Sequence, residues 1–118
     1  MNGRTMRVSG PGRVANNAWT GHALAVVNGG RAWLYAVVGT NASVAQVYLQ
    51  VFDKASAAVA GDKPLLSIQV PAGNTASLDW SGGRPFNCGL QVAFSQSAGE
   101  YAAPGGSGYL IDVCYETF

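Results

Sequence analysis

The chain has 118 residues, of which 48% are hydrophobic and 11% charged, and its formal net charge is +1 at pH 7. This length allows one domain with a buried core, and the near-zero net charge excludes a strong general field that would attract nucleic acid. The charged fraction lies well below the roughly one quarter that is usual in globular domains. Two interpretations stay open: partners or copies of the chain cover part of the surface, or a small β-domain has a surface of Ser, Asn, Gln and Thr.

The first 18 residues are predicted to form an extended arm, and residues 19–118 the single β-sandwich domain. The arm is rich in glycine, contains a proline and shows almost no apolar periodicity. Its arginines, Arg4, Arg7 and Arg13, precede every acidic residue of the chain, and we expect them to contact a neighbouring subunit. We find no signal peptide and no hydrophobic run long enough for a membrane span, so the sequence predicts synthesis in the cytoplasm and no membrane partner.

After the arm, apolar and polar residues alternate in short runs that turn signals separate. In residues 47–52 the side chains of Val47, Leu49 and Val51 are expected on one face, and those of Tyr48, Gln50 and Phe52 on the other. The expected strands cover residues 24–27, 31–38, 47–52, 65–70, 75–80, 86–96 and 109–115. Residues 39–43 and 81–85 are expected to be a turn and a loop, and no run has helical periodicity.

This pattern predicts an all-β fold, an antiparallel β-sandwich or a jelly-roll-like barrel of about seven strands with an extended N-terminal arm. The loop after residue 52 contains Asp53 and Asp62, which are expected to accept backbone N–H bonds and so to cap the loop. A calcium loop is the weaker alternative, because calcium needs six or more oxygen ligands and only two carboxylates are nearby.

The two cysteines, Cys88 and Cys114, lie in runs that both resemble strands. Free buried thiols are expected in a cytosolic product, whereas an oxidising setting would allow a disulfide within the chain or between copies. A zinc site is not expected, because the chain has no CxxC motif and a single histidine.

No motif predicts catalysis or a cofactor. His22 is the only histidine, no GxSxG motif occurs, and the glycine-rich residues 105–108 precede a strand and lack the lysine of a phosphate-binding loop. We therefore predict that the chain is not an enzyme and has no catalytic residue, cofactor or metal. Three tryptophans, Trp19, Trp33 and Trp80, either fill the core or contact a sugar ring or another subunit.

Residues 48–73 read YLQVFDKASAAVAGDKPLLSIQVPAG, and SLDW and GGRPFNCGLQVAFSQSAGEY follow. These stretches resemble small virion proteins of tailed double-stranded DNA phages, over about residues 31–115. The matching residues belong to turns and strands, so no catalytic residue is carried over.

The resemblance implies a non-enzymatic capsid decoration or cement subunit that stabilises the head and is located in the virion. It also implies a homo-oligomer, expected to be a trimer, that contacts the major capsid protein or other virion subunits. The alternative is a carbohydrate-binding or adaptor module of a phage neck, tail or fibre.

Overall fold

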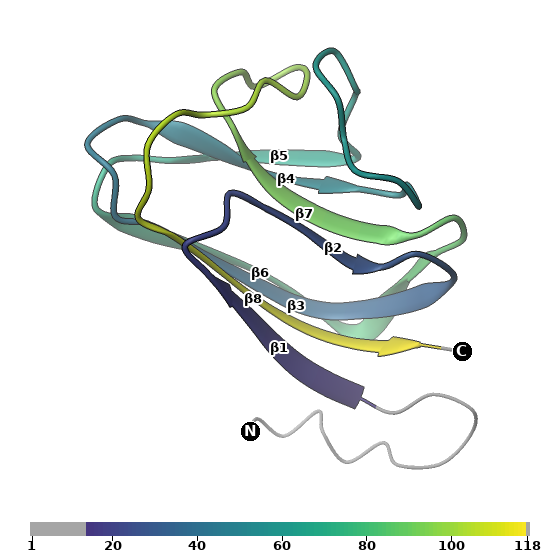
Figure 1. Ribbon diagram of the computed structural model, residues 1–118. Helices are drawn as coiled ribbons and strands as arrows, with labels where there is room; N and C mark the ends of the chain where they lie inside the picture. Colours follow the sequence, from purple (N-terminus) through teal and green to yellow (C-terminus); the bar gives the residue numbers. More distant parts are fainter. Residues whose placement is uncertain (1–13, 118) are drawn as a thin grey trace.

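Eight β-strands make up the regular structure of residues 14–117, the part of the chain that the computed structural model describes (Figure 1). They are β1 (Val14–Thr20), β2 (Leu24–Asn28), β3 (Ala32–Asn41), β4 (Val47–Phe52), β5 (Leu66–Val70), β6 (Asn74–Phe86), β7 (Leu90–Ser95) and β8 (Tyr109–Thr117). Over these residues there is no helix long and apolar enough to cross a membrane.

The strands form two four-stranded sheets that pack face to face. Sheet A has the strand order β1-β8-β3-β6, and sheet B has the order β2-β7-β4-β5. All neighbouring strands within each sheet are antiparallel. The predicted all-β antiparallel sandwich is therefore confirmed.

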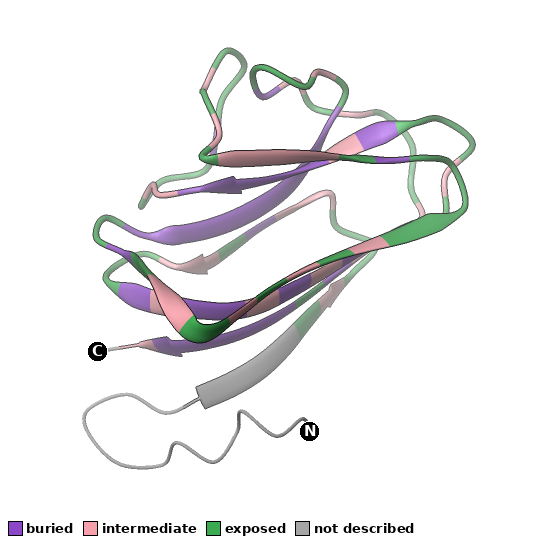
Figure 2. Ribbon diagram, turned by 180° about the vertical axis from the view of Figure 1, so that it is seen from behind, coloured by how far each residue is buried: buried purple, intermediate pink, exposed green. Residues whose placement is uncertain are grey.

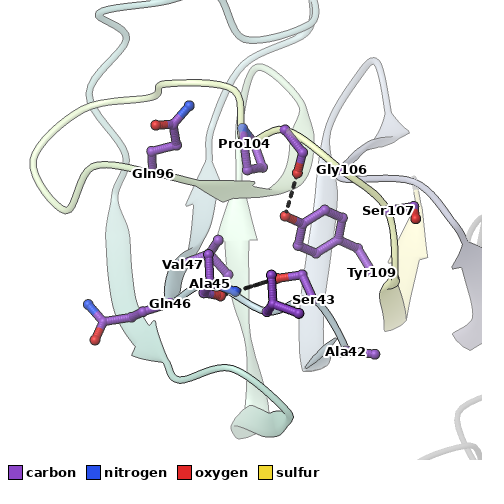
Figure 3. Close-up of a pocket in the computed structure, with 12 residues that line it drawn as sticks. Ala42, Ser43, Ala45, Gln46, Val47, Gln96, Pro104, Gly106, Ser107 and Tyr109 are labelled. Atoms are coloured by element: carbon purple, nitrogen blue, oxygen red, sulfur yellow. Dashed lines mark hydrogen bonds between the residues drawn. The ribbon is translucent and has the colours of Figure 1, made fainter.

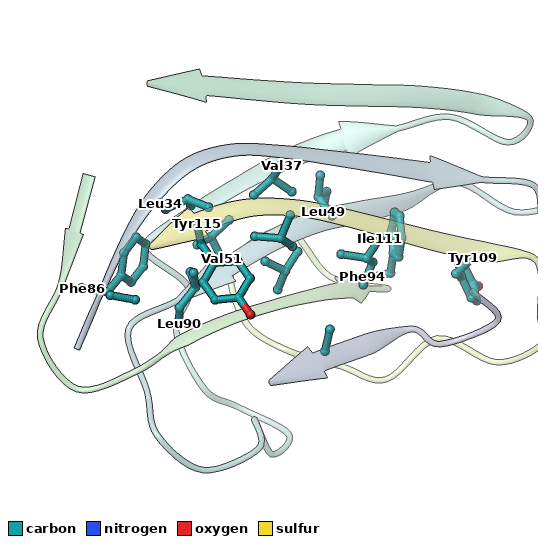
Figure 4. Close-up of a cluster of buried hydrophobic side chains, with 14 of the residues drawn as sticks. Leu34, Val37, Leu49, Val51, Phe86, Leu90, Phe94, Tyr109, Ile111 and Tyr115 are labelled. Atoms are coloured by element: carbon teal, nitrogen blue, oxygen red, sulfur yellow. The ribbon is translucent and has the colours of Figure 1, made fainter. Parts of the chain in front are cut away.

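The main core lies between the two sheets and follows the alternation of the sequence. From sheet B, the side chains of Leu49, Val51 and Phe94 point inward and are fully buried. They meet inward side chains of sheet A, among them Val37 and Ile111 (Figure 4). Strands with one face on such a core need apolar side chains at every second position, which explains why the central strands could be predicted.

The predicted boundary of the arm is wrong, because β1 already begins at Val14 and pairs with β8 from Val14 opposite Glu116 to Thr20 opposite Leu110. Residues 14–17 show no local strand pattern, and a partner almost 100 positions away fixes their conformation. An eighth strand results. Residues 1–13, with Arg4, Arg7 and Arg13, lie outside the described residues.

Two further boundaries differ from the sequence prediction. Strand β3 continues to Asn41 through the predicted turn, and β6 continues to Phe86 through the predicted loop at residues 81–85. Gly39 in the first stretch pairs with Ala76 of β6, which holds glycine backbone in the sheet despite its low strand propensity. In the second stretch Arg84 and Pro85 pair with Leu34 and Trp33, whereas residues 80–83 have no partner on β3 because the register shifts between Leu34 and Ala36. The predicted strand at residues 86–96 begins only at Leu90.

The outer face of sheet B is covered by two long loops, residues 53–65 and 96–108. A second apolar cluster lies beneath them, in which Phe52 and Tyr101 pack edge to face with ring centroids 6.0 Å apart. The loops also bond to each other, because Gly61 N–H donates to Tyr101 O at 3.0 Å and Tyr101 N–H donates to Asp62 O at 2.7 Å. The outward residues of β7 are consequently buried, as its inward residues are by the main core (Figure 2).

Polar side chains on this covered face bind the loop backbones. The amide of Gln91 donates to Ser56 O at 2.8 Å and accepts from Ala58 N–H at 2.6 Å. Gln50 Nε2 donates to Ser97 O at 2.7 Å, while Gln50 Oε1 is buried with no donor among the described residues. A buried amide stabilises a fold only where partners replace the water it has lost, so these two glutamines require the loops to stay in place.

Replacing Gln91 by leucine should lower the free energy of unfolding by about 2 kcal/mol, because the buried Ala58 N–H loses its acceptor. The matched control is Gln69→Leu, since Gln69 is exposed and its side chain donates a hydrogen bond to the exposed Gln46 side chain. It should change stability by less than about 0.5 kcal/mol. Urea unfolding of both variants measures the difference. Equal losses of stability in the two variants would contradict the claim that Gln91 holds the loop against sheet B.

Candidate functional site

The side chain of Asn41 organises the loop between β3 and β4 at one end of the sandwich. It is fully buried, and its Nδ2 donates to Ala45 O at 2.8 Å and to Val70 O at 3.0 Å. Its Oδ1 accepts from Ser43 N–H at 3.0 Å and from Ser43 Oγ at 2.6 Å. Because every hydrogen-bonding position of the side chain is used, the loop is held in one conformation.

The glycine-rich loop before β8 packs against this first loop. Ala42 N–H donates to Gly108 O at 2.8 Å, and Tyr109 Oη donates to Gly105 O at 2.9 Å. Gly108 has a φ of +95°, and a Cβ there would lie 3.2 Å from the carbonyl carbon of Ala42. The two loops therefore approach as closely as they do only because residue 108 has no side chain.

Between the two loops lies an open pocket of about 690 Å³ (Figure 3). No acidic or basic side chain lines it. Its lining consists of Ala42, Ser43, Val44, Ala45, Gln46, Val47, Gln96, Pro104, Gly105, Gly106, Ser107 and Tyr109. Such a lining offers hydroxyl, amide and carbonyl groups together with small apolar surfaces, and so fits an uncharged ligand.

Two side chains show which parts of the pocket are accessible. Val44 is 99% exposed, although valine is among the residues most often buried. Tyr109 is buried, with its ring 5.0 Å from that of Phe94 in the core. It forms part of the pocket wall and does not offer a free ring face for stacking.

The three tryptophans predicted as contacts are not brought together. Trp19 and Trp80 are half-buried, pack against the main core and belong to opposite edge strands of sheet A. Trp33 is half-buried beside Gly83. None of them lines the pocket, so core packing accounts for two of the three.

No disulfide joins Cys88 and Cys114 in the described structure, and the pairing of either thiol under oxidising conditions stays a prediction. Cys88 is exposed in the turn between β6 and β7, which contradicts the expected burial, and Cys114 is buried in β8, as expected. His22 is exposed between β1 and β2. Within residues 14–117 no group of three or more His, Cys, Asp or Glu side chains could hold a metal ion.

Asp53 accepts three backbone N–H bonds, as expected, but from a distant turn instead of its own loop. The donors are Cys88 at 2.8 Å and Asn87 and Gly89 at 3.2 Å each. Partial burial raises the pKa of Asp53, but the three donors outweigh it, so that the pKa lies below its ordinary value. This carboxylate joins the end of β4 to the turn before β7.

Asp62 caps its own loop, as the sequence predicted. Its Oδ2 accepts from Val59 N–H at 2.9 Å and lies 2.9 Å from Lys54 Nζ. The hydrogen bond from Val59 and the neighbouring Lys54 lower the pKa of Asp62. The two aspartates thus bind different groups instead of sharing one cation.

The contact between the two pocket loops can be tested with a pair of glycines that have the same φ. Gly108→Ala and Gly61→Ala each place alanine at φ +95°, at a cost of about 1–2 kcal/mol. Only at Gly108 does the new Cβ meet other backbone, since nothing lies within 4 Å at Gly61. Gly108→Ala should therefore destabilise the chain more in chemical denaturation. Equal losses would contradict the close approach of the loops.

Three comparisons with known proteins give no match. No protein-family model matches the chain, and neither a curated protein nor a solved structure does.

Proposed function

We propose that the chain is a non-enzymatic structural subunit of a phage virion, in its simplest form a capsid decoration subunit that stabilises the head. The order of the strands carries this proposal. We assign the orders β1-β8-β3-β6 and β2-β7-β4-β5 to the eight-stranded jelly roll, an architecture of viral capsid domains and also of lectins and cupins.

Because a fold by itself does not fix a function, the proposal also depends on the resemblance of residues 31–115 to small phage virion proteins. Two properties of the described chain support a subunit that acts by contact. Charged residues make up only 11% of the sequence, and the pocket has no charged side chain that would serve as an acid or base. The proposed partners are the major capsid protein or other virion subunits, and the proposed assembly is a homotrimer.

Immunoelectron microscopy tests the location directly. With antibody raised against the purified chain, label should appear on the heads of virions produced from the genome that encodes it. Label on the neck, tail or fibre would contradict the decoration role and would support an adaptor role instead. Virions without any label, and without the chain in their mass spectrum, would contradict the virion proposal as a whole.

A second function, binding of an uncharged glycan, is favoured by the composition of the pocket. Gln96 and Ser107 contribute an amide and a hydroxyl, and Val44 presents an exposed apolar surface beside them. Sugars offer a similar mixture of hydroxyls and C–H surface. This version of the carbohydrate-binding alternative depends on the two pocket loops, and not on the tryptophans that the sequence suggested.

A glycan array distinguishes the pocket from the tryptophans. Neutral oligosaccharides should bind, and Ser107→Ala combined with Val44→Ala should weaken binding at least tenfold, while Trp33→Ala should leave it unchanged. Both pocket residues are exposed, so the double variant should keep its fold. Absence of binding to any neutral glycan would exclude this function, and loss of binding in Trp33→Ala alone would move the site to sheet A.

A further inference from the structure

We infer that the pocket continues into a second sugar subsite on the outer face of sheet B. There the ring of Tyr48 stacks on a sugar, and the amides of Gln46 and Gln69 bind its hydroxyls. The inference rests on the proposed binding of an uncharged glycan and deepens it, because a pocket with a second subsite selects an oligosaccharide over a single sugar.

Tyr48 lies where the loop cover over strand β4 ends. Its side chain points outward, because those of its neighbours Val47 and Leu49 belong to the main core. The next outward position, Gln50, is fully buried and bonds to loop 96–108. Tyr48 is only half-buried, so part of its ring is open to solvent. An aromatic ring in this position offers a flat apolar surface for the C–H groups of a sugar.

The two neighbouring strands fix the sides of this surface. The register places Tyr48 between Gln69 of β5 and Ser95 of β7. Ser95 is buried, and its Oγ accepts from Ala102 N–H at 2.9 Å, so loop 96–108 borders Tyr48 on that side. Gln69, on the other side, is exposed. A sugar placed on Tyr48 therefore has a loop on one side and an accessible amide on the other.

A chain of hydrogen bonds joins the three polar side chains. Gln69 Nε2 donates to Gln46 Oε1 at 2.7 Å, and Gln46 Nε2 donates to Tyr48 Oη at 3.2 Å. Each amide nitrogen has two N–H groups and each of these bonds uses one, so a second N–H on each glutamine can bind a ligand. Such a row suits sugar hydroxyls, which both donate and accept. Because the side chains already hold one another, the entropic cost of binding is reduced.

Gln46 connects this surface to the pocket, because it lines the pocket and also bonds to Tyr48. Gln96, the first residue after β7, lines the pocket as well. Figure 3 shows Gln46 and Gln96 on the side of the pocket away from Tyr109 and Ser107. A ligand that fills the pocket and leaves it past Gln46 therefore meets Tyr48 next.

The subsite supplies the accessible aromatic ring that the pocket itself lacks. Tyr109 is buried in the pocket wall, and no tryptophan lines the pocket. Ligand sites combine apolar and aromatic surface with a few placed polar groups. With Tyr48 included, Val44 and Ser107 contact the first sugar, and the tyrosine with its two amides contacts the next. None of these side chains is charged at pH 7, so a neutral oligosaccharide fits both parts of the site.

Isothermal titration with neutral mono-, di- and trisaccharides tests the subsite. Tyr48→Leu keeps an apolar side chain but removes the flat ring, and should weaken binding of the di- and trisaccharides about tenfold. Tyr48→Phe is the matched control, since it keeps the ring, and should stay within about threefold of the parent. Gln69→Ala, at an exposed position, should weaken trisaccharide binding about threefold. Monosaccharide affinity should be unchanged in all three variants, because a single sugar occupies the pocket.

The outcomes separate the subsite from the pocket. Unchanged oligosaccharide affinity in Tyr48→Leu, with binding still weakened by the double variant of Ser107 and Val44, would overturn the subsite and leave the glycan function standing. If a lower melting temperature explains the loss in Tyr48→Leu, Gln69→Ala decides, and unchanged trisaccharide binding there would overturn the inference. A parent chain that binds no neutral saccharide would overturn the subsite and the glycan function together. The virion role is tested separately, by the location of the chain.

Discussion

The buried amides of Gln50 and Gln91 hold two long loops against the outer face of sheet B. Each lies on a central strand with no access to water, and the loop backbones supply most of its hydrogen bonds. The hydrogen bonds between the loops at Gly61 and Tyr101 complete the layer. A three-layered arrangement follows, in which sheet A keeps the only outer face that no described segment covers.

The pocket depends on one of these loops, residues 96–108, and on the loop between β3 and β4. Asn41 fixes the loop between β3 and β4, and Gly108 allows the glycine-rich loop to lie against it. A site held this way by buried hydrogen bonds is formed before a ligand arrives, which reduces the entropic cost of binding. Its lack of charged side chains favours a neutral ligand, and this restricts the proposed carbohydrate alternative to uncharged glycans without affecting the proposed structural role.

The sequence predicted what local periodicity encodes and missed what distant segments determine together. The alternation of Val47, Leu49 and Val51 with more polar residues predicted strand β4 and its inward face correctly. Strand β1 and the pocket could not be found, because each needs partners far along the chain. For Asp53 the type of interaction was predicted correctly, but its donors lie about 35 residues away. The burial of the polar outer positions of β7 could not be predicted either, since nothing local indicates that loops cover them.

Amide hydrogen exchange of the purified chain tests the central claim, that the loops form a fixed layer over sheet B. The amides of Ala58, Gly61 and Tyr101 donate to Gln91, to Tyr101 O and to Asp62 O respectively. They should exchange nearly as slowly as the amide of Leu49 in the centre of sheet B. Exchange of these three amides at the rate of an open loop, with Leu49 still protected, would contradict the account.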